Sequence, residues 1–291
     1  MEIFNLVNNA IEYIEINLSE ELSIDEIAKV AFTSRYHFQR MFHALTGFTV
    51  TEYIRNRRLT MAAEELISKD CKVIDVAYKY GYESSDAFTK AFQRLHGTTP
   101  SALRKGEVKI KSFPKLSFQI SVKGGSEMIY RIVERGQFKV FGVDFLTNTV
   151  NDACYKEIPE FCDGIWEDGT HYRINEFLGY PKMHMLDGIH YDFHEDGSRR
   201  FLMGWEVPDN KSIPKEYTML DIEEHTWVVF EDKGKLPDKL LVEDVWRRIY
   251  SEWFPSSAFE QVEGPCLEKH YWNDNKYESY TCEVWIPVKR K

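Results

Sequence analysis

The chain has 291 residues, 43% of them hydrophobic, and a formal net charge of −10. This length favours two domains, and no apolar run is long enough to span a membrane. The first residues, MEIFNLVNNAIEYIEINL, are acidic and do not begin like a signal peptide. Five scattered cysteines, without a CxxC pair, indicate reduced thiols. We therefore expect a cytoplasmic protein.

The charge is unevenly distributed along the chain. Residues 1–27 carry a net charge of −7, residues 28–123 carry +9 and residues 124–291 carry −12. A basic block between acidic ones indicates a local contact with a polyanion, which the whole-chain pI near 5.5 hides. All seven tryptophans lie in the last 126 residues. The two ends of the chain are therefore expected to have different tasks.

Residues 24–46 are predicted to form two helices around a short break at 31–33. Ser23 or Asp25 can cap the first helix, and Ser34 can cap the second. The second helix has apolar residues at a spacing that places them on one buried face. These residues are Phe38, Met41, Phe42 and Leu45.

A long helix is predicted over residues 50–67. Its inward residues are expected to be Ile54, Met61, Ala62, Leu66 and Ile67. Its outward residues are expected to be Arg55, Arg57 and Arg58. The earlier pattern then restarts with a helix near Ile74, a turn at Tyr80–Gly81–Tyr82, and a second helix capped by Ser84.

Residues 34–49 and 84–99 repeat the same pattern at a shift of 50. Phe38 corresponds to Phe88, and Gly47 corresponds to Gly97, which is placed to end its helix. Such a pair of helices joined by a turn is typical of a helix-turn-helix unit. The sequence therefore predicts an all-α region with two such units.

The outward faces of the two second helices carry residues that suit DNA. In the first unit these are Arg35, Tyr36, Gln39, Arg40 and His43, and in the second they are Ser85, Asp86, Thr89, Lys90 and Gln93. Arg and Gln side chains match guanine and adenine edges in the major groove, and Lys, Thr and Ser serve base edges or phosphates. The alternatives are ordinary solvated faces or a protein-binding helical repeat.

The stretch VIDVAYKYGYESSDAFTKAFQRLHGTTPSALR closely resembles the signature of AraC/XylS-type transcription regulators. The resemblance covers about residues 5–105. It implies two recognition helices about one DNA turn apart on promoter DNA, and we expect RNA polymerase as a further partner. The base-reading positions that it implies are Arg35, Tyr36, Gln39, Arg40, Ser85, Asp86, Ala87, Thr89 and Lys90.

Three residues depart from the pattern of this family. Phe32 stands in the first turn where a small residue is usual, and Leu103 replaces an expected Tyr. Asp86 places a carboxylate at the presumed DNA surface, where it can accept from a cytosine amino group or weaken the contact. We therefore expect the first unit to contribute more to base readout.

The remaining residues are predicted to form an α+β domain with a largely antiparallel sheet. Alternation indicates a strand within 116–122, and Gly124–Gly125–Ser126 marks a boundary. Further strands are expected within 130–145, 188–193, 200–207, 217–222 and 225–230, and helices within 151–162 and 239–251. The predicted division is a DNA-binding domain at 1–107, a linker or edge strand at 108–126, and a second domain at 127–291.

A fainter repeat is visible in this second domain. FLMGWEVP (201–208) is similar to YTCEVWIPV (280–288), and each follows a strand, a helix and another strand. The pattern indicates a duplicated β-α-β-β unit. Two such halves would leave a cleft between them, which is a common place for a ligand.

Glu283 stands in an apolar strand next to Trp285. A buried carboxylate needs a partner, and a ligand cation beside aromatic rings is one possibility. The alternatives are that Glu283 faces solvent or pairs with an internal Arg. YTCEVWIPV resembles the GyrI-like effector-binding domain over about 127–291. That resemblance implies a small cationic or aromatic effector bound by Glu283 and Trp285, with Trp205 and Glu206 equivalent in the first half.

Other functions are weighed against this one. Some GyrI-like domains hydrolyse reactive small molecules, and others are protein-interaction modules. His190 and His194 have helical metal-ligand spacing, but their segment is predicted to be a strand, so we expect no metal site. No phosphate-binding glycine loop or GxSxG motif is present, and no cofactor is expected. The leading hypothesis is a one-component transcriptional regulator without enzymatic activity.

Overall fold

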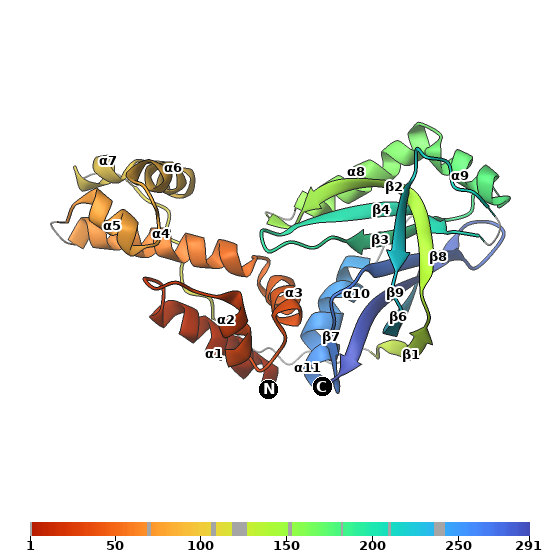
Figure 1. Cartoon of the computed structure of the whole chain (residues 1–291), viewed down its shortest axis with the longest axis horizontal. Coiled ribbons are helices and arrows are strands. Elements are labelled where there is room, and N and C mark those ends of the chain that lie inside the picture. The colour runs from red at the N-terminus through yellow and green to blue at the C-terminus, as the bar shows by residue number, and fades with distance from the viewer. Residues whose placement is uncertain are drawn as a thin grey trace. The chain divides into compact units, whose positions relative to one another are not determined.

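A computed structural model describes residues 2–68, 71–105, 109–117, 127–150, 153–181, 183–208, 211–235 and 242–291. They form two compact units, one of residues 1–38 and 49–121 and one of residues 39–48 and 122–291. The N-terminal helices are α1 (Glu2–Ile16), α2 (Ile24–Val30), α3 (Arg35–Thr46), α4 (Val50–Ser68), α5 (Val73–Lys79), α6 (Ser85–His96) and α7 (Pro100–Arg104) (Figure 1).

The helix-turn-helix prediction is confirmed by two pairs, α2–α3 and α5–α6. Their second helices are capped as expected. The Oγ of Ser34 accepts from the backbone N–H of His37 at 3.3 Å, and the Oγ of Ser84 accepts from that of Ala87 at 3.2 Å. Gly47 and Gly97 both have φ of 75°, the left-handed conformation that ends a helix.

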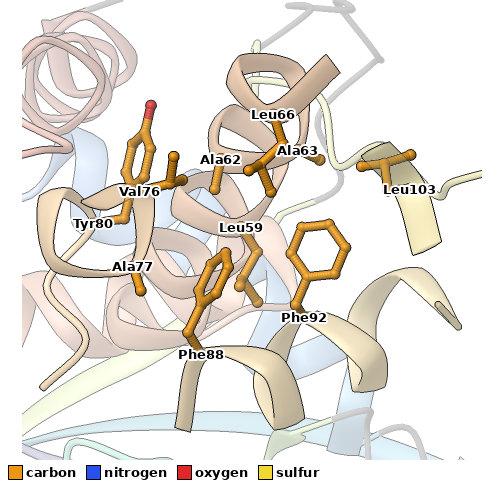
Figure 2. Packing of buried hydrophobic residues seen from close by; sticks show 10 residues of the cluster. All are labelled: Leu59, Ala62, Ala63, Leu66, Val76, Ala77, Tyr80, Phe88, Phe92 and Leu103. Carbon is orange, nitrogen blue, oxygen red and sulfur yellow. The ribbon is translucent and has the colours of Figure 1, made fainter. Parts of the chain in front are cut away.

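The second helix pair is held by a compact apolar core. Phe88 and Phe92 of α6 are fully buried, and they pack against α4 and α5 (Figure 2). Leu103, which replaces an expected Tyr, is buried in the same cluster. The other members are Leu59, Ala62, Ala63, Leu66, Val76, Ala77 and Tyr80. This core fixes the inner face of α6, so its outer face is available for recognition.

The prediction that Arg57 points outward is wrong. Arg57 is only 8% exposed, and its guanidinium binds the carboxylate of Glu15 on α1 at 2.8 Å. It also donates to the carbonyl oxygen of Phe113 at 2.6 Å. Ile67, predicted to face inward, is exposed. Arg57 therefore joins α1, α4 and the segment 109–117, where the structure has no strand.

The second unit is built on a nine-stranded sheet in which every pairing is antiparallel. The strand order is β1-β6-β9-β8-β3-β4-β2-β5, and β7 pairs with β9. The strands are β1 (Ile129–Arg135), β2 (Phe138–Asn148), β3 (Asp187–Tyr191), β4 (Ser198–Glu206), β5 (Thr218–Ile222), β6 (His225–Lys235), β7 (Phe259–Gln261), β8 (Cys266–Trp272) and β9 (Ser279–Arg290). The predicted α+β class is thus confirmed.

The helices of this unit are α8 (Ala153–Glu167), α9 (Thr170–Leu178), α10 (Val242–Arg248), the π-helix η2 (Ile249–Trp253) and α11 (Phe254–Ser256). They pack on one face of the sheet, which we call the helix-covered face. Phe161 of α8 stacks on Phe145 of β2, and Trp253 contacts Phe230 of β6 edge-on. Figure 1 shows α8 and α9 lying over the strands.

The opposite face of the sheet carries a second apolar core. Trp227, Val229, Leu267 and Trp285 pack there with Val140, Ile189, Leu202 and Ile222. Strand alternation decides which residues share this face, since successive side chains point to opposite sides. Glu283 lies two residues before Trp285 and therefore shares the opposite face with it.

Candidate functional site

Helix α6 presents the second set of predicted DNA-reading residues. Asp86 and Lys90 are exposed, and Ser85 and Thr89 are half-buried. Asp86 and Lys90 lie on the side of α6 away from the buried Phe88 and Phe92. The amphipathic spacing that buries the two phenylalanines is thus what presents the polar residues.

Helix α3 carries the first set of predicted DNA-reading residues. Arg35 is exposed, and its guanidinium lies 3.1 Å from the carboxylate of Asp25 on α2. Tyr36, Gln39 and Arg40 are half-buried, and the last two are grouped with the second compact unit. The helix therefore presents Arg35, whereas the guanidinium of Arg40 lies 4.0 Å from the ring centroid of Phe193 and lines the cavity described below.

The predicted effector residue Glu283 is already paired within the domain. It is 7% exposed, and its Oε1 accepts from the guanidinium of Arg131 on β1 at 2.7 Å. Its Oε2 accepts from the indole N–H of Trp285 at 2.9 Å. The structure thus shows the alternative considered from the sequence, in which Glu283 pairs with an internal Arg.

Trp205 and Glu206, which the predicted duplication made equivalent in the first half, lie on different faces of the sheet. Glu206 lies on the opposite face and binds Arg135 of β1 at 2.5 Å. Trp205 lies on the helix-covered face, where its ring contacts Tyr180 and His184. The structure therefore brings Glu283, Trp285 and Glu206 to one face and does not bring Trp205 to them.

A cavity of about 400 Å³ lies on the helix-covered face. Residues 40–44 of α3, helices α8 and α9, the α10–η2 segment and strands β3, β4 and β8 contribute to its wall. The wall includes Arg40, Trp166, Arg199, Phe201, Trp246, Tyr250, Glu268 and His270. Large rings thus surround a small number of charged and polar groups, which is the usual composition of a small-molecule site.

Glu268 is the buried acid of this cavity, and it is only 9% exposed. Its Oε1 accepts from Nε2 of His190 at 2.9 Å and from the indole N–H of Trp246 at 2.6 Å. Burial raises the pKa of Glu268, but His190 and Trp246 outweigh burial and lower it. Burial lowers the pKa of His190, whereas the charge of Glu268 raises it. Glu268 and His190 therefore form a coupled buried pair, and among the described residues no Lys or Arg side chain forms an ion pair with Glu268.

Two family models match the chain. Residues 27–106 match a helix-turn-helix domain, and residues 131–288, more than half of the chain, match the integron-associated effector binding protein family. The chain is 39% identical to the probable transcription factor PqrA of Proteus vulgaris over 103 residues, which are 35% of this chain and 84% of PqrA. The chain belongs to the AraC family of transcriptional regulators. Its second domain is an effector-binding domain of the GyrI-like kind.

Other relatives of this AraC-family regulator agree with the match. SoxS of Salmonella typhimurium is 38% identical over 99 residues, which are 34% of this chain and 92% of SoxS. The chain is also similar to the solved structure of SAV2435 bound to tetraphenylphosphonium. That match covers 56% of this chain and 94% of the SAV2435 chain, with 18% sequence identity and a TM-score of 0.44. No helix in the described residues of the regulator is long and apolar enough to cross a membrane.

Sequence reasoning missed Glu268. A signal was present in CLEKHYW (266–272), where Glu268 and His270 alternate with apolar neighbours and share one face of a strand. Only the pairing of β8 with β3 places Glu268 opposite Gly188 and close to His190. Among the described residues, no group of three or more His, Cys, Asp or Glu side chains could hold a metal ion.

Proposed function

We propose that the regulator couples promoter binding to the binding of a small cationic or lipophilic effector in the cavity at Glu268. It acts in the cytoplasm, reads DNA with α3 and α6, communicates with RNA polymerase, and binds its effector without chemical turnover. The observation that carries the effector site is a buried carboxylate in the wall of an aromatic-lined cavity, with no Lys or Arg ion pair among the described residues.

The chemistry of the cavity favours a cation with apolar substituents. An ionised carboxylate out of water is costly unless a charge of opposite sign compensates it. A cation at Glu268 would supply that charge. Trp246 and Tyr250 stack 6.2 Å apart at the same wall, and such rings attract cations through their faces. Apolar substituents would pack against Phe201 and Trp166.

Glu283 on the opposite face is a less favourable site for an effector. Its charge is already compensated by Arg131, whose guanidinium also lies 5.8 Å from the ring centroid of Trp285. An effector cation would have to replace this internal cation and its cation–π contact. The predicted role of Glu283 therefore remains an alternative that experiment can separate from the role of Glu268.

Tetraphenylphosphonium, a lipophilic cation, is a suitable probe for the full-length chain. The operator would first be selected from random-sequence duplexes, and its affinity would be measured by fluorescence anisotropy with and without saturating probe. We expect a change in DNA affinity, because an effector that couples to DNA must alter it. Glu268→Gln should weaken probe binding by about tenfold or more, as expected for a lost charged interaction.

Glu283→Gln is the matched control, since it removes the same charge from the opposite face. It should leave probe binding within about twofold of the unmodified chain, which corresponds to less than about 0.5 kcal/mol. If Glu283→Gln abolishes binding and Glu268→Gln does not, the effector site is on the opposite face. A DNA affinity that is unchanged by saturating probe argues against coupling.

A further inference from the structure

Positively charged side chains also line the effector cavity, namely Arg40, Arg199 and Arg247. Arg199 of β4 contributes to the cavity wall, and its Nε is buried without a hydrogen-bond partner in the described part of the chain. No ion pair to a carboxylate is formed by Arg199 among those residues. Its neighbour Arg200, by contrast, binds Asp144 at 2.5 Å on the opposite face.

Strand register separates Arg199 from Glu268. Glu268 pairs with Gly188, and Gly188 pairs with Met203 on β4. Arg199 lies four residues before Met203 on β4, so the side chains of Arg199 and Met203 share the helix-covered face. Along the strand, Arg199 lies about 13 Å from Met203. Its long side chain can shorten that separation. The cavity therefore has a negative end at Glu268 and a positive end at Arg199, and the charge of Glu268 raises the pKa of Arg199.

Burial is unfavourable for the charges of both Glu268 and Arg199, because each loses hydration. A ligand that carries only a positive charge would compensate Glu268 but not Arg199. Burial lowers the pKa of Arg199, which shows that its charged form is disfavoured where it stands. The positive end of the cavity therefore offers the buried Nε of Arg199 to a ligand acceptor.

We infer that the preferred effector is an aromatic zwitterion, with a cationic group at Glu268 and a carboxylate or similar acceptor at Arg199. This inference rests on the proposed function and adds the second charge to it. The aromatic body would lie between the two ends, against Phe201 and the rings of α8 and α10. Each end then gains a charge-assisted contact in a cavity that excludes much of the water.

Three matched probes test the inference by calorimetry on the full-length chain. The zwitterion is 6-(aminomethyl)-2-naphthoic acid, the acid is 6-methyl-2-naphthoic acid, and the amine is 2-(aminomethyl)-6-methylnaphthalene. We expect the zwitterion to bind at least about tenfold more tightly than either of the others, because each lost charged contact reduces affinity by this order.

Variants assign each charge to its end of the cavity. Arg199→Gln should remove the advantage of the zwitterion over the amine and leave the affinity of the amine unchanged. Glu268→Gln should remove the affinity advantage of the zwitterion over the acid. Arg200→Gln, a neighbouring arginine on the opposite face, should change neither, and circular dichroism would check that all variants fold.

The outcomes separate this inference from the proposed function. If the amine and zwitterion bind equally and Arg199→Gln has no effect, the zwitterion inference is overturned while a cationic effector at Glu268 stands. If the zwitterion does not bind at all, the inference also fails. If tetraphenylphosphonium leaves DNA affinity unchanged while the zwitterion binds as expected, the cavity assignment stands and the coupling does not.

Discussion

The buried carboxylates of the effector domain differ in how their charge is compensated. Glu283 is paired with Arg131, whereas Glu268 accepts hydrogen bonds from His190 and Trp246. Asp187 is 5% exposed and has the ammonium of Lys269 3.6 Å from its Oδ2, while its Oδ1 has no partner in the described part of the chain. Burial raises the pKa of Asp187 to about 7 despite Lys269. Asp187 therefore titrates near neutral pH in the folded chain.

This raised pKa gives a prediction about stability and pH. The unfolded chain releases the proton of Asp187 near pH 4 and the folded chain releases it near pH 7, so the folded state binds more protons between these values. The free energy of unfolding should therefore fall as pH rises from about 4 to 7. Asp187→Asn should remove this fall, as measured by urea unfolding at pH 5 and pH 8. Asp221→Asn, on an exposed pair with Lys139, should keep it.

The DNA-reading residues give a second prediction at this scale. Arg40→Ala should relax sequence preference, because Arg reads guanine edges, while Lys90→Ala should weaken all duplexes evenly and reduce the salt dependence by about one ion. Gel-shift competition between selected and random duplexes measures both effects. Lys72→Ala, exposed but outside both reading helices, should change neither. Full discrimination by Arg40→Ala would contradict the assignment of Arg40 as a base reader.

At the scale of elements, the two helix-turn-helix units differ in their turns. In the second unit Gly81 has φ of 80°. The N–H of Gly81 donates to the carbonyl oxygen of Tyr78, and the N–H of Tyr82 donates to the carbonyl oxygen of Ala77. Phe32 holds the corresponding place in the first unit, with φ of 50°. The N–H of Phe32 donates to the carbonyl oxygen of Lys29, and the N–H of Thr33 donates to the carbonyl oxygen of Ala28. Gly81 and Phe32 both stand at the C′ position of a Schellman motif, where glycine is favoured. The following helix cap comes two residues after Phe32 and three after Gly81.

This difference predicts that Phe32→Gly stabilises the regulator. The left-handed conformation costs a residue other than glycine about 1–2 kcal/mol, and Phe32 is 84% exposed, so little burial is lost. The expected gain is about 1 kcal/mol in the free energy of unfolding, measured by urea titration. Phe32→Ala keeps the strained conformation and should give no such gain. An equal gain from both variants would show that removing the exposed ring, rather than relieving the backbone, is responsible.

The elements were predictable where their signals were local. The spacing of Phe88 and Phe92, with Ser84 before them and Gly97 after, predicted α6 correctly. Trp205 and Glu206 are adjacent in a strand, so alternation alone implied that they face opposite ways. The burial of Arg57 was not predictable, because its partner Glu15 lies on another helix. The cavity at Glu268 was not predictable either, since it depends on the pairing of β3 with β8.

At the scale of the whole molecule, the regulator joins a basic segment that binds a polyanion to an acidic domain that binds a small molecule. Two helix-turn-helix units with different outward residues allow one chain to read an asymmetric site. If effector and DNA affect each other, the effect must be the same in both directions. Coupling between the two sites can therefore be measured either as the effect of the effector on DNA affinity or as the effect of DNA on effector affinity.

This reciprocity is a prediction for the intact chain. The factor by which tetraphenylphosphonium changes DNA affinity should equal the factor by which selected DNA changes the affinity for tetraphenylphosphonium. Calorimetry with and without saturating duplex measures the second factor. Glu268→Gln should reduce both factors together if Glu268 is the site through which the probe acts. Unequal factors would indicate that the probe binds at more than one site.

The pairing of β1 has a consequence for synthesis on the ribosome. Among the described strands, β1 pairs with β6 alone, and Arg135 lies opposite His225. At about 5–20 residues per second, β1 must wait roughly 5–20 seconds before its partner is made. During that time Ile129, Tyr130 and Ile132, still largely exposed in the finished fold, have no neighbouring strand. The helices up to residue 104 are complete before β1 is made, so the nascent DNA-binding unit can form first, with an unpaired strand behind it.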